Sequence, residues 1–160
     1  MVPELVHTFD ATIEFVEKSV ADLSEQQMVE QPTGVPNHAA WTLGHVILSC
    51  QGIAVELGAE AWLPDNWESV YGYGSMPRGD LQFYPRKAEL LAILASATSR
   101  LRQALLAATD SVLSRSLPGG QLPTMAHLLL QVVVAHTAYH AGQLTVWRRA
   151  IGKHSVGVFV

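Results

Sequence analysis

The chain has 160 residues, 49% of them hydrophobic and 15% charged, a composition that excludes a disordered chain and favours one domain spanning residues 1–160. The net charge of −4 and the lack of a dense basic run argue against a nucleic-acid partner. Cys50 is the single cysteine, which excludes an intrachain disulfide, and the lack of a secretory signal pattern predicts a cytoplasmic protein.

Charge is divided unevenly along the chain. Residues 1–80 contain 12 acidic and 2 basic residues, whereas residues 81–160 contain 2 acidic and 8 basic residues. Opposite charge would help the two halves to pack against each other or help two subunits to pair. Residues 31–55 and 116–147 contain no charged side chain, but their prolines, histidines and glutamines would be costly in a membrane. We therefore predict buried helices there and no membrane partner.

Apolar residues at helical spacing predict a first helix over residues 5–23. Ser24 and Gln27 then form the pattern of a capping box, which predicts a short second helical turn. Asn37 is the expected N-cap of a helix over residues 39–57. Apolar residues occupy nearly the whole circumference of that helix, so we expect it to lie at the centre of the fold.

Residues 58–84 break the helical pattern with glycines and prolines, and they form the long loop that follows the second long helix. A loop of this length is uncommon unless it is functional or disordered. Its aromatic residues argue against disorder. They are Trp62, Trp67, Tyr71, Tyr73, Phe83 and Tyr84.

Pro85 is the expected first residue of a third long helix, which leucines at helical spacing extend to about residue 109. The linker LPGGQLP follows, and Thr124 is the expected cap of a fourth helix. The predicted inward positions of that helix are Met125, Leu129, Val132, His136, His140, Gln143 and Trp147. Four long amphipathic helices predict an all-α fold, an up-down four-helix bundle with the aromatic loop between helices two and three.

Two histidines, His136 and His140, lie four residues apart in VVVAHTAYHAGQL, which places both imidazoles on one face of the fourth helix. Two buried imidazoles without partners would be costly, whereas this spacing lets both rings bind one metal ion. His45 is the best candidate for a third ligand because it interrupts the apolar helix WTLGHVILSC, with Gly44 beside it to allow close approach of a neighbouring backbone. The histidines that fit a metal site less well are His7, His38, His127 and His154. His38 lies at the start of a helix, where it would cap that helix or line the pocket.

The residues around these histidines exclude two kinds of metalloenzyme. Ferritin-like di-iron sites need glutamates, but no acidic residue follows Asp110. A zinc protease of the His-Glu-x-x-His type needs a glutamate where this sequence has Thr137. A haem bound by two histidines stays open as a minor alternative, with His45 opposite either His136 or His140.

The segments WTLGHVILS and HTAYHAGQL together resemble the signature of the DinB-like (damage-inducible, YfiT-like) superfamily of metal-dependent bundle proteins. The resemblance implies that His45, His136 and His140 hold one divalent ion, which is nickel, zinc or iron among relatives, and that the protein is a homodimer. It also implies thiol chemistry, since some relatives transfer bacillithiol or use mycothiol in an isomerisation. The long aromatic loop departs from those enzymes, so the identity of a thiol does not carry over.

We therefore expect a metal-dependent enzyme whose ion activates a bound water or thiol, with a small-molecule substrate. Transferase or hydrolase chemistry with a low-molecular-weight thiol is one form that this activity can take. The alternative is a non-enzymatic, metal-stabilised bundle that binds a small molecule or a partner under stress. No catalytic residue is identified; the residues expected next to the metal or in its pocket are Gln143, Trp41, His38, Trp62, Trp67 and Tyr71.

The loop over residues 58–84 has two possible roles. As a lid over the open face of the metal, it would use Trp62, Trp67 or Tyr71 to wall a substrate pocket. As a plug, it would bury the same rings at one end of the bundle or in a dimer contact.

Overall fold

The structure is a computed structural model that describes residues 1–119 and 121–157. Within these residues the regular elements are helices, joined by turns and irregular segments with one isolated β-bridge between Ser116 and Thr124, so the predicted all-α class is confirmed. Gly120, part of the predicted linker LPGGQLP, lies outside the described residues. No helix in the described ranges combines the length and the hydropathy that crossing a membrane requires.

The helical elements differ in length and include two that are not α-helical, the short 3-10 helix η1 and the π-helical segment η2. In chain order they are α1 (Val2–Ala21), α2 (Glu25–Met28), α3 (Ala39–Glu56), α4 (Trp67–Tyr71), η1 (Leu81–Phe83), α5 (Lys87–Ala107), α6 (Asp110–Ser114), α7 (Met125–Leu129), η2 (Leu130–His136) and α8 (Thr137–Ala150).

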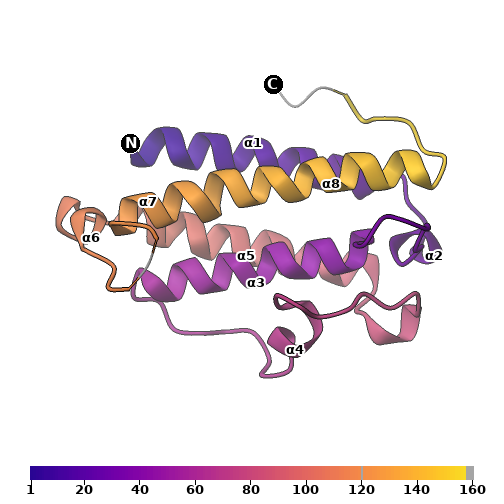
Figure 1. Cartoon of the computed structure of the whole chain (residues 1–160), viewed down its shortest axis with the longest axis horizontal. Coiled ribbons are helices and arrows are strands. Elements are labelled where there is room, and N and C mark those ends of the chain that lie inside the picture. The colour runs from indigo at the N-terminus through magenta and orange to yellow at the C-terminus, as the bar shows by residue number, and fades with distance from the viewer. Residues whose placement is uncertain (120, 158–160) are drawn as a thin grey trace.

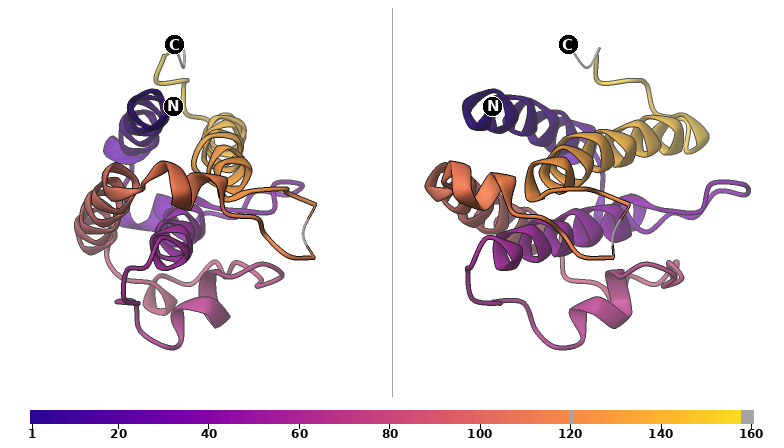
Figure 2. Two further views of the ribbon diagram at one scale, coloured as in Figure 1. Left: turned by 90° about the vertical axis from the view of Figure 1, so that its left-hand side faces the viewer. Right: turned by 60° about the vertical axis from the view of Figure 1, so that its left-hand side comes forward.

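In the described part of the chain, four long helical segments lie side by side around one apolar core (Figures 1 and 2). They are α1, α3, α5 and the continuous run of α7, η2 and α8. α1 packs against α8, and α3 packs along α5. α4 lies outside these four against α3, so the segment between α3 and α5 covers one side of the molecule (Figure 1). α3 thus contacts α4, α5 and α8, the central place that its sequence predicts.

The start of α3 differs from the sequence prediction, because His38 and not Asn37 is its N-cap. His38 has an extended backbone, and its Nδ1 accepts a hydrogen bond from the backbone N–H of Trp41 (3.2 Å). The Asn37 side chain points elsewhere and donates to Gln143 Oε1 (3.3 Å). An imidazole nitrogen therefore accepts the hydrogen bond from a free backbone N–H in the first turn of the helix, the role that the sequence predicts for the Asn37 side-chain oxygen.

The first helices and their connections follow from local capping. The capping box of Ser24 and Gln27 is confirmed, since each side chain bonds the other residue's backbone. α5 begins at Lys87 rather than at the predicted Pro85, because the backbone N–H of Lys87 donates to the Glu25 carboxylate (3.1 Å), which caps the helix from α2. The sequence prediction also missed the short helices α4, η1 and α6.

The fourth segment contains a π-helical stretch, η2, that the sequence did not predict. At its end the Thr137 hydroxyl donates to the carbonyl of Val132, five residues earlier (3.2 Å). A π-turn holds more residues than an α-turn, so it rotates the buried face of the helix. Val133 and Thr137 are buried as a result, whereas Val132, a predicted inward residue, is only half-buried.

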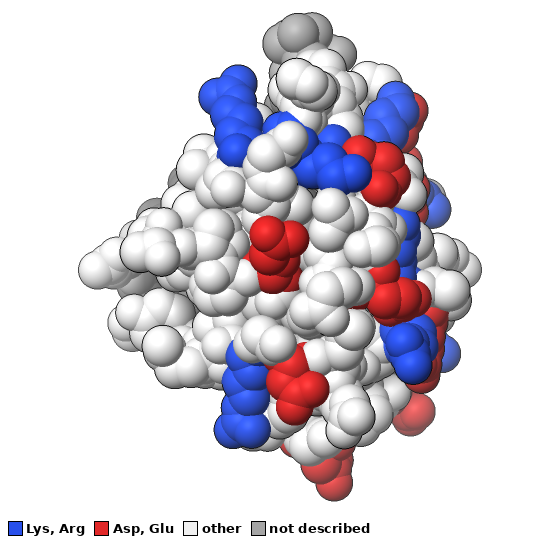
Figure 3. All heavy atoms as spheres, turned by 90° about the vertical axis from the view of Figure 1, so that its right-hand side faces the viewer, with Lys and Arg blue, Asp and Glu red and all other residues white. Residues whose placement is uncertain are grey.

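The acidic and basic halves of the chain pair with each other across the helices. In four ion pairs of the described residues the acid comes from the first half and the base from the second. They are Asp10 with Arg102 (2.6 Å), Glu56 with Arg115 (3.4 Å), and Asp22 with both Arg148 (2.6 Å) and Lys153 (3.3 Å). On the end of the molecule that Figure 3 faces, acidic and basic side chains accordingly lie interspersed.

The pair of Asp22 and Arg148 joins the end of α1 to α8. The Arg148 side chain is 4% exposed and also donates to the carbonyls of Ser19 (2.7 Å) and His154 (3.0 Å). Hydrogen bonding from Arg148 is the main reason that the pKa of Asp22 falls to about 2. Because the folded pKa lies below the unfolded value, this pair stabilises the fold above about pH 4 and stops doing so as the pH falls through about 2.

We expect Asp22→Asn to lower the free energy of unfolding by about 1–2 kcal/mol at pH 7, because the buried guanidinium of Arg148 loses its carboxylate. Urea unfolding from pH 7 to pH 2.5 measures this, and the difference from wild type should shrink below pH 4. Glu14→Gln, in the exposed pair with Lys18, is the control and should change stability by less than about 0.5 kcal/mol. A difference that is constant with pH would contradict the assignment.

Candidate metal centre

Three histidines from two helices meet where α3 faces the η2–α8 segment. His136 Nε2 lies 3.1 Å from His45 Nε2 and 3.1 Å from His140 Nε2. His136 ends η2 and His140 follows one turn later on α8, with ring centroids 4.5 Å apart. One nitrogen from each ring lies within 4.8 Å of the others, so the structure brings together the three residues that the sequence singled out.

The outer nitrogens of two rings fix which inner nitrogen carries a lone pair. His45 Nδ1 lies 2.6 Å from the carbonyl oxygen of Tyr71, and His140 Nδ1 lies 2.8 Å from Gln143 Oε1. Both oxygens only accept, so both Nδ1 atoms carry the proton in the neutral rings. The Nε2 atoms of His45 and His140 therefore direct lone pairs toward Nε2 of His136.

This arrangement is better satisfied by a cation than by a proton. An N–H on His136 Nε2 could point at only one of the two lone pairs, whereas a metal ion accepts all three. His136 Nδ1 is buried and has no hydrogen-bond partner among the described residues. It would hold the ring proton when Nε2 binds a metal, and so one buried donor still lacks its acceptor.

The nitrogen separations also fit a single ion. Two imidazole nitrogens about 2.05 Å from one metal lie about 3.3 Å apart at a tetrahedral angle and about 2.9 Å apart at a right angle. The two separations of 3.1 Å at His136 lie between these values. Three neutral nitrogens suit zinc, nickel or iron, and three protein ligands leave coordination positions for water or substrate.

Burial keeps all three imidazoles neutral. It lowers the pKa of His45 and of His136, and for His136 the charge of His45 acts in the same direction. Burial is also the main cause that lowers the pKa of His140 to about 3, with further lowering by His136 and His45. Because a metal ligand must be the unprotonated nitrogen, the cluster is ready for a cation at neutral pH.

Trp41 covers one ligand. Its ring stacks on the ring of His45 with centroids 4.8 Å apart and planes 10° from parallel. The indole N–H of Trp41 donates to the Ser75 hydroxyl (2.9 Å), which fixes the ring from the segment after α4. The Trp41 ring is also 6.3 Å from that of His140, so this predicted pocket residue lies beside the cluster.

Gln143 orients a second ligand through a chain of hydrogen bonds. Its Oε1 accepts from His140 Nδ1 and from Asn37 Nδ2, and its Nε2 donates to the Tyr139 hydroxyl (2.8 Å). The predicted inward position of Gln143 is only half-buried, because its amide spans from the cluster to the surface. Partners of this kind hold a ligating ring in one tautomer and one orientation.

Tyr71 connects the segment between α3 and α5 to the third ligand. Its carbonyl accepts from His45 Nδ1, and its ring lies so close to Gly44 that a Cβ on that residue would collide with ring atoms. Gly44 therefore allows close approach as predicted, although to a ring and not to a backbone. Trp67 completes the contact by donating from its indole N–H to the carbonyl of Gly44 (3.0 Å).

The sequence did not reveal three groups that act on His45 or on the Trp41 ring that covers it. They are the Tyr71 carbonyl, the Ser75 hydroxyl and the Glu68 carboxylate. Glu68 lies on α4, and its negative charge acts to raise the pKa of His45 against the effect of burial. A backbone carbonyl has no sequence signature, and the other two lie more than 20 residues from His45 in sequence. Only the fold of the segment between α3 and α5 brings them near.

The side chains of the remaining candidates do not belong to the cluster, although the Tyr71 carbonyl contacts His45. His38 caps α3, and its Nε2 donates to the carbonyl of Arg78 (3.0 Å). Trp62, Trp67 and Tyr71 line a cavity between α4 and α5, and none of the three clustered histidines lines it. The remaining histidines that the sequence analysis set aside are exposed, and they are His7, His127 and His154.

Comparison with solved structures shows the same fold in another protein. The crystal structure of a conserved protein from Enterococcus faecalis aligns with a TM-score of 0.79 and 18% sequence identity, over 96% of this chain and 98% of that one. At this identity the likeness establishes the fold alone. A search of curated protein sequences gave no match.

The family itself is shown by sequence. The sequence model of the DinB superfamily matches residues 8–144, which include the α3 histidine and both histidines of the fourth segment. The match covers most of the chain and agrees with the resemblance found in the two histidine segments. The chain therefore belongs to the DinB superfamily.

Proposed function

We propose that the protein is a metal-dependent enzyme in which His45, His136 and His140 hold one divalent ion. The observation that carries the proposal is the meeting of three Nε2 atoms, two of which have lone pairs fixed by the outer hydrogen bonds. Membership of the DinB superfamily and the helical scaffold, which we take to be a four-helix bundle, support the same conclusion.

When bound, the ion would act as a Lewis acid that lowers the pKa of a water or thiol at an open position. The residues of the chain orient the ligating nitrogens and shield them from water. His45 and His140 keep their Nε2 lone pairs inward because Tyr71 and Gln143 hold their Nδ1 protons. Trp41 shields one face of His45 from water. We propose a small-molecule substrate, with a low-molecular-weight thiol as the candidate nucleophile.

The alternative is a non-enzymatic bundle in which the metal only joins α3 to the fourth segment. Two features favour the enzyme. The apolar core closes around α1, α3, α5 and α8 without the cluster, so the fold does not rest on the ion. The three histidines also leave coordination positions free, whereas structural zinc sites are closed by four protein ligands.

We also propose a homodimer that uses the outer face of α8. Tyr139 and Val146 lie seven residues apart on that face and are 61% and 57% exposed. Beside them, the segment of residues 34–37 and α8 form an apolar hollow of about 510 Å³. Contiguous apolar area that is exposed on a protein surface often marks a site of association with another protein.

We expect alanine replacement of His45, His136 or His140 to lower metal affinity at least tenfold, because each variant removes one of three ligands. Elemental analysis of protein purified without a polyhistidine tag measures the metal per chain. His127→Ala and His154→Ala, at exposed positions, are the matched controls and should keep the wild-type content. Full metal content in all three cluster variants would refute the site.

Chelation and refilling with cobalt separate the enzyme from the metal-stabilised bundle. We expect the chelated protein to keep its far-ultraviolet circular dichroism. In the cobalt form, 2-mercaptoethanol should produce a thiolate-to-cobalt absorption at pH 7, well below the usual thiol pKa of about 8.5. Cys50 is buried and cannot supply that signal. Unfolding on chelation, with no thiol absorption, would instead support the bundle without catalysis.

For the dimer, we expect light scattering to give twice the chain mass of 17.4 kDa. Val146→Glu should halve that mass because it places a charge on the apolar face of α8, while metal content stays unchanged. Val55→Glu, at an exposed valine on α3, is the control and should remain dimeric. A wild-type protein with the mass of one chain would contradict the proposal.

A further inference from the structure

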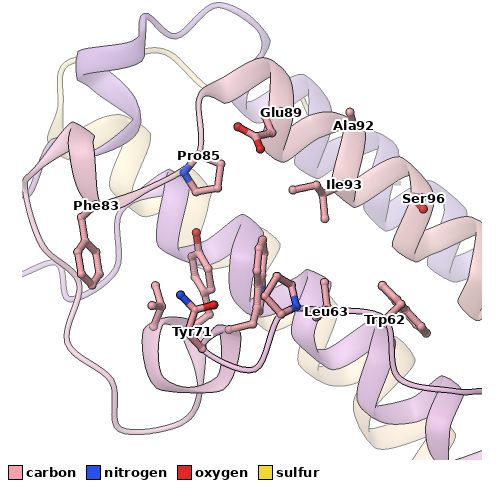
Figure 4. Close-up of a pocket in the computed structure, with 13 residues that line it drawn as sticks. Trp62, Leu63, Tyr71, Phe83, Pro85, Glu89, Ala92, Ile93 and Ser96 are labelled. Atoms are coloured by element: carbon pink, nitrogen blue, oxygen red, sulfur yellow. The ribbon is translucent and has the colours of Figure 1, made fainter.

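A cavity of about 600 Å³ lies between α5 and the segment that contains α4 (Figure 4). Tyr71 separates it from the histidine cluster: its carbonyl accepts from His45, while its ring forms part of the cavity wall. The volume is in the range of pockets that bind small organic molecules. Trp62, Trp67 and Tyr71, which the sequence assigned to a metal pocket, therefore wall a different space.

The walls of this cavity are rich in aromatic rings, namely those of Trp62, Trp67, Tyr71 and Phe83. The face of an aromatic ring attracts cations. The chain itself pairs two of these rings with cations from outside the cavity. The guanidinium of Arg100 lies 5.0 Å from the Trp62 ring, and that of Arg78 lies 4.2 Å from the Phe83 ring.

Glu89 is the one charged residue among those that line the cavity. It extends from α5 on one side of the cavity, and the Tyr71 side chain forms the wall on the opposite side (Figure 4). No described cation forms an ion pair with Glu89. Burial is the main cause that raises the pKa of Tyr71, and the charges of Tyr84 and then of Glu89 act in the same direction, so the charge of Glu89 reaches the cavity wall.

Two buried polar groups of the cavity wall lack hydrogen-bond partners, Trp62 Nε1 and the Tyr71 hydroxyl. Tyr71 is 2% exposed, so its hydroxyl is removed from water by the walls that surround it. Leaving such a group unpaired costs about 1–3 kcal/mol. In the described residues the other orphan is His136 Nδ1, which belongs to the metal cluster.

We propose that this cavity is a second binding site, for a small organic ammonium ion with a ring-containing apolar body. The ammonium group pairs with Glu89 and donates to the Tyr71 hydroxyl, while the body lies against Trp62 and Phe83. The Trp62 N–H then faces the π surface or an acceptor of the bound molecule. The site does not depend on the metal, because no clustered histidine lines it.

Three indole compounds that differ in charge test the class of ligand. Tryptamine is the cation, tryptophol is its neutral isostere with a hydroxyl in place of the ammonium, and indole-3-acetate is the anion. We expect tryptamine to bind at least tenfold more tightly than tryptophol and indole-3-acetate to bind least. Calorimetry gives the affinities, and the indole N–H resonance of Trp62, assigned with Trp62→Phe, should shift during the titration.

Variants then locate the site. Glu89→Gln should weaken tryptamine binding about tenfold without changing tryptophol binding, because only the cation pairs with the carboxylate. Glu17→Gln, an exposed glutamate on α1, is the charge-matched control and should change neither. Ala92→Phe places a ring in the cavity from an exposed position on α5 and should abolish binding of both compounds.

His136→Ala separates this inference from the metal proposal, since tryptamine should bind that variant as tightly as it binds wild type. Weakened binding in His136→Ala would mean that the amine sits at the histidine cluster, and would overturn the second site. Equal affinity for tryptamine and tryptophol would also overturn the second site. The same holds if tryptamine does not bind at 10 mM, which is roughly the weakest dissociation constant that such a site would have. Binding that survives Ala92→Phe would overturn it as well.

Discussion

Two outward hydrogen bonds determine the chemistry of the histidine cluster. The Tyr71 carbonyl and the Gln143 side chain hold the Nδ1 protons of His45 and His140, and this leaves both Nε2 lone pairs directed at His136. Burial makes protonation of these rings costly, as the pKa of His140 at about 3 reflects. Close, buried lone pairs repel unless a cation lies between them, so the fold creates a strong demand for a metal ion.

The scaffold meets this demand with elements from opposite parts of the chain. α3 supplies His45 from the acidic half, and the fourth segment supplies His136 and His140 from the basic half. Ion pairs between the halves, such as Asp22 with Arg148, hold the fourth segment against α1. The π-helical η2 ends at His136 and sets the rotation of the helix at the point where the ligands begin.

Tyr71 gives the segment between α3 and α5 two roles at once. Its backbone fixes one ligand of the cluster, and its side chain closes the aromatic cavity beside α5. Gly44 makes this possible, because any Cβ there would displace the ring. The long aromatic segment is thus packed against α3 through Trp67 and Tyr71, which are buried, whereas its Tyr73 and Met76 side chains are exposed.

Much of this could be predicted from sequence because it depends on local spacing. The i, i+4 pair of His136 and His140 fixes a common face on any helix, and the capping box of Ser24 and Gln27 is a local pattern. His45 stood out as a polar residue in an apolar helix. The long helices follow from the spacing of apolar residues.

The missed features depend on the tertiary fold. The Tyr71 carbonyl has no sequence signature, and the hydrogen bond that holds the His38 ring joins it to the Arg78 carbonyl, 40 residues away. The π-turn at Leu130–His136 has no distinctive composition, since its apolar residues suit an α-helix equally well. The placement of Trp62, Trp67 and Tyr71 around a cavity beside α5 required the packing of α4 to be known.

X-ray absorption at the metal edge, on protein purified without a polyhistidine tag, tests the central claim most directly. The account predicts three imidazole nitrogens at about 2.0–2.1 Å, together with at least one water oxygen at an open position. Replacing His136 with alanine should remove one imidazole from that shell. A shell of oxygen ligands without imidazole, or one that His136→Ala leaves unchanged, would contradict it.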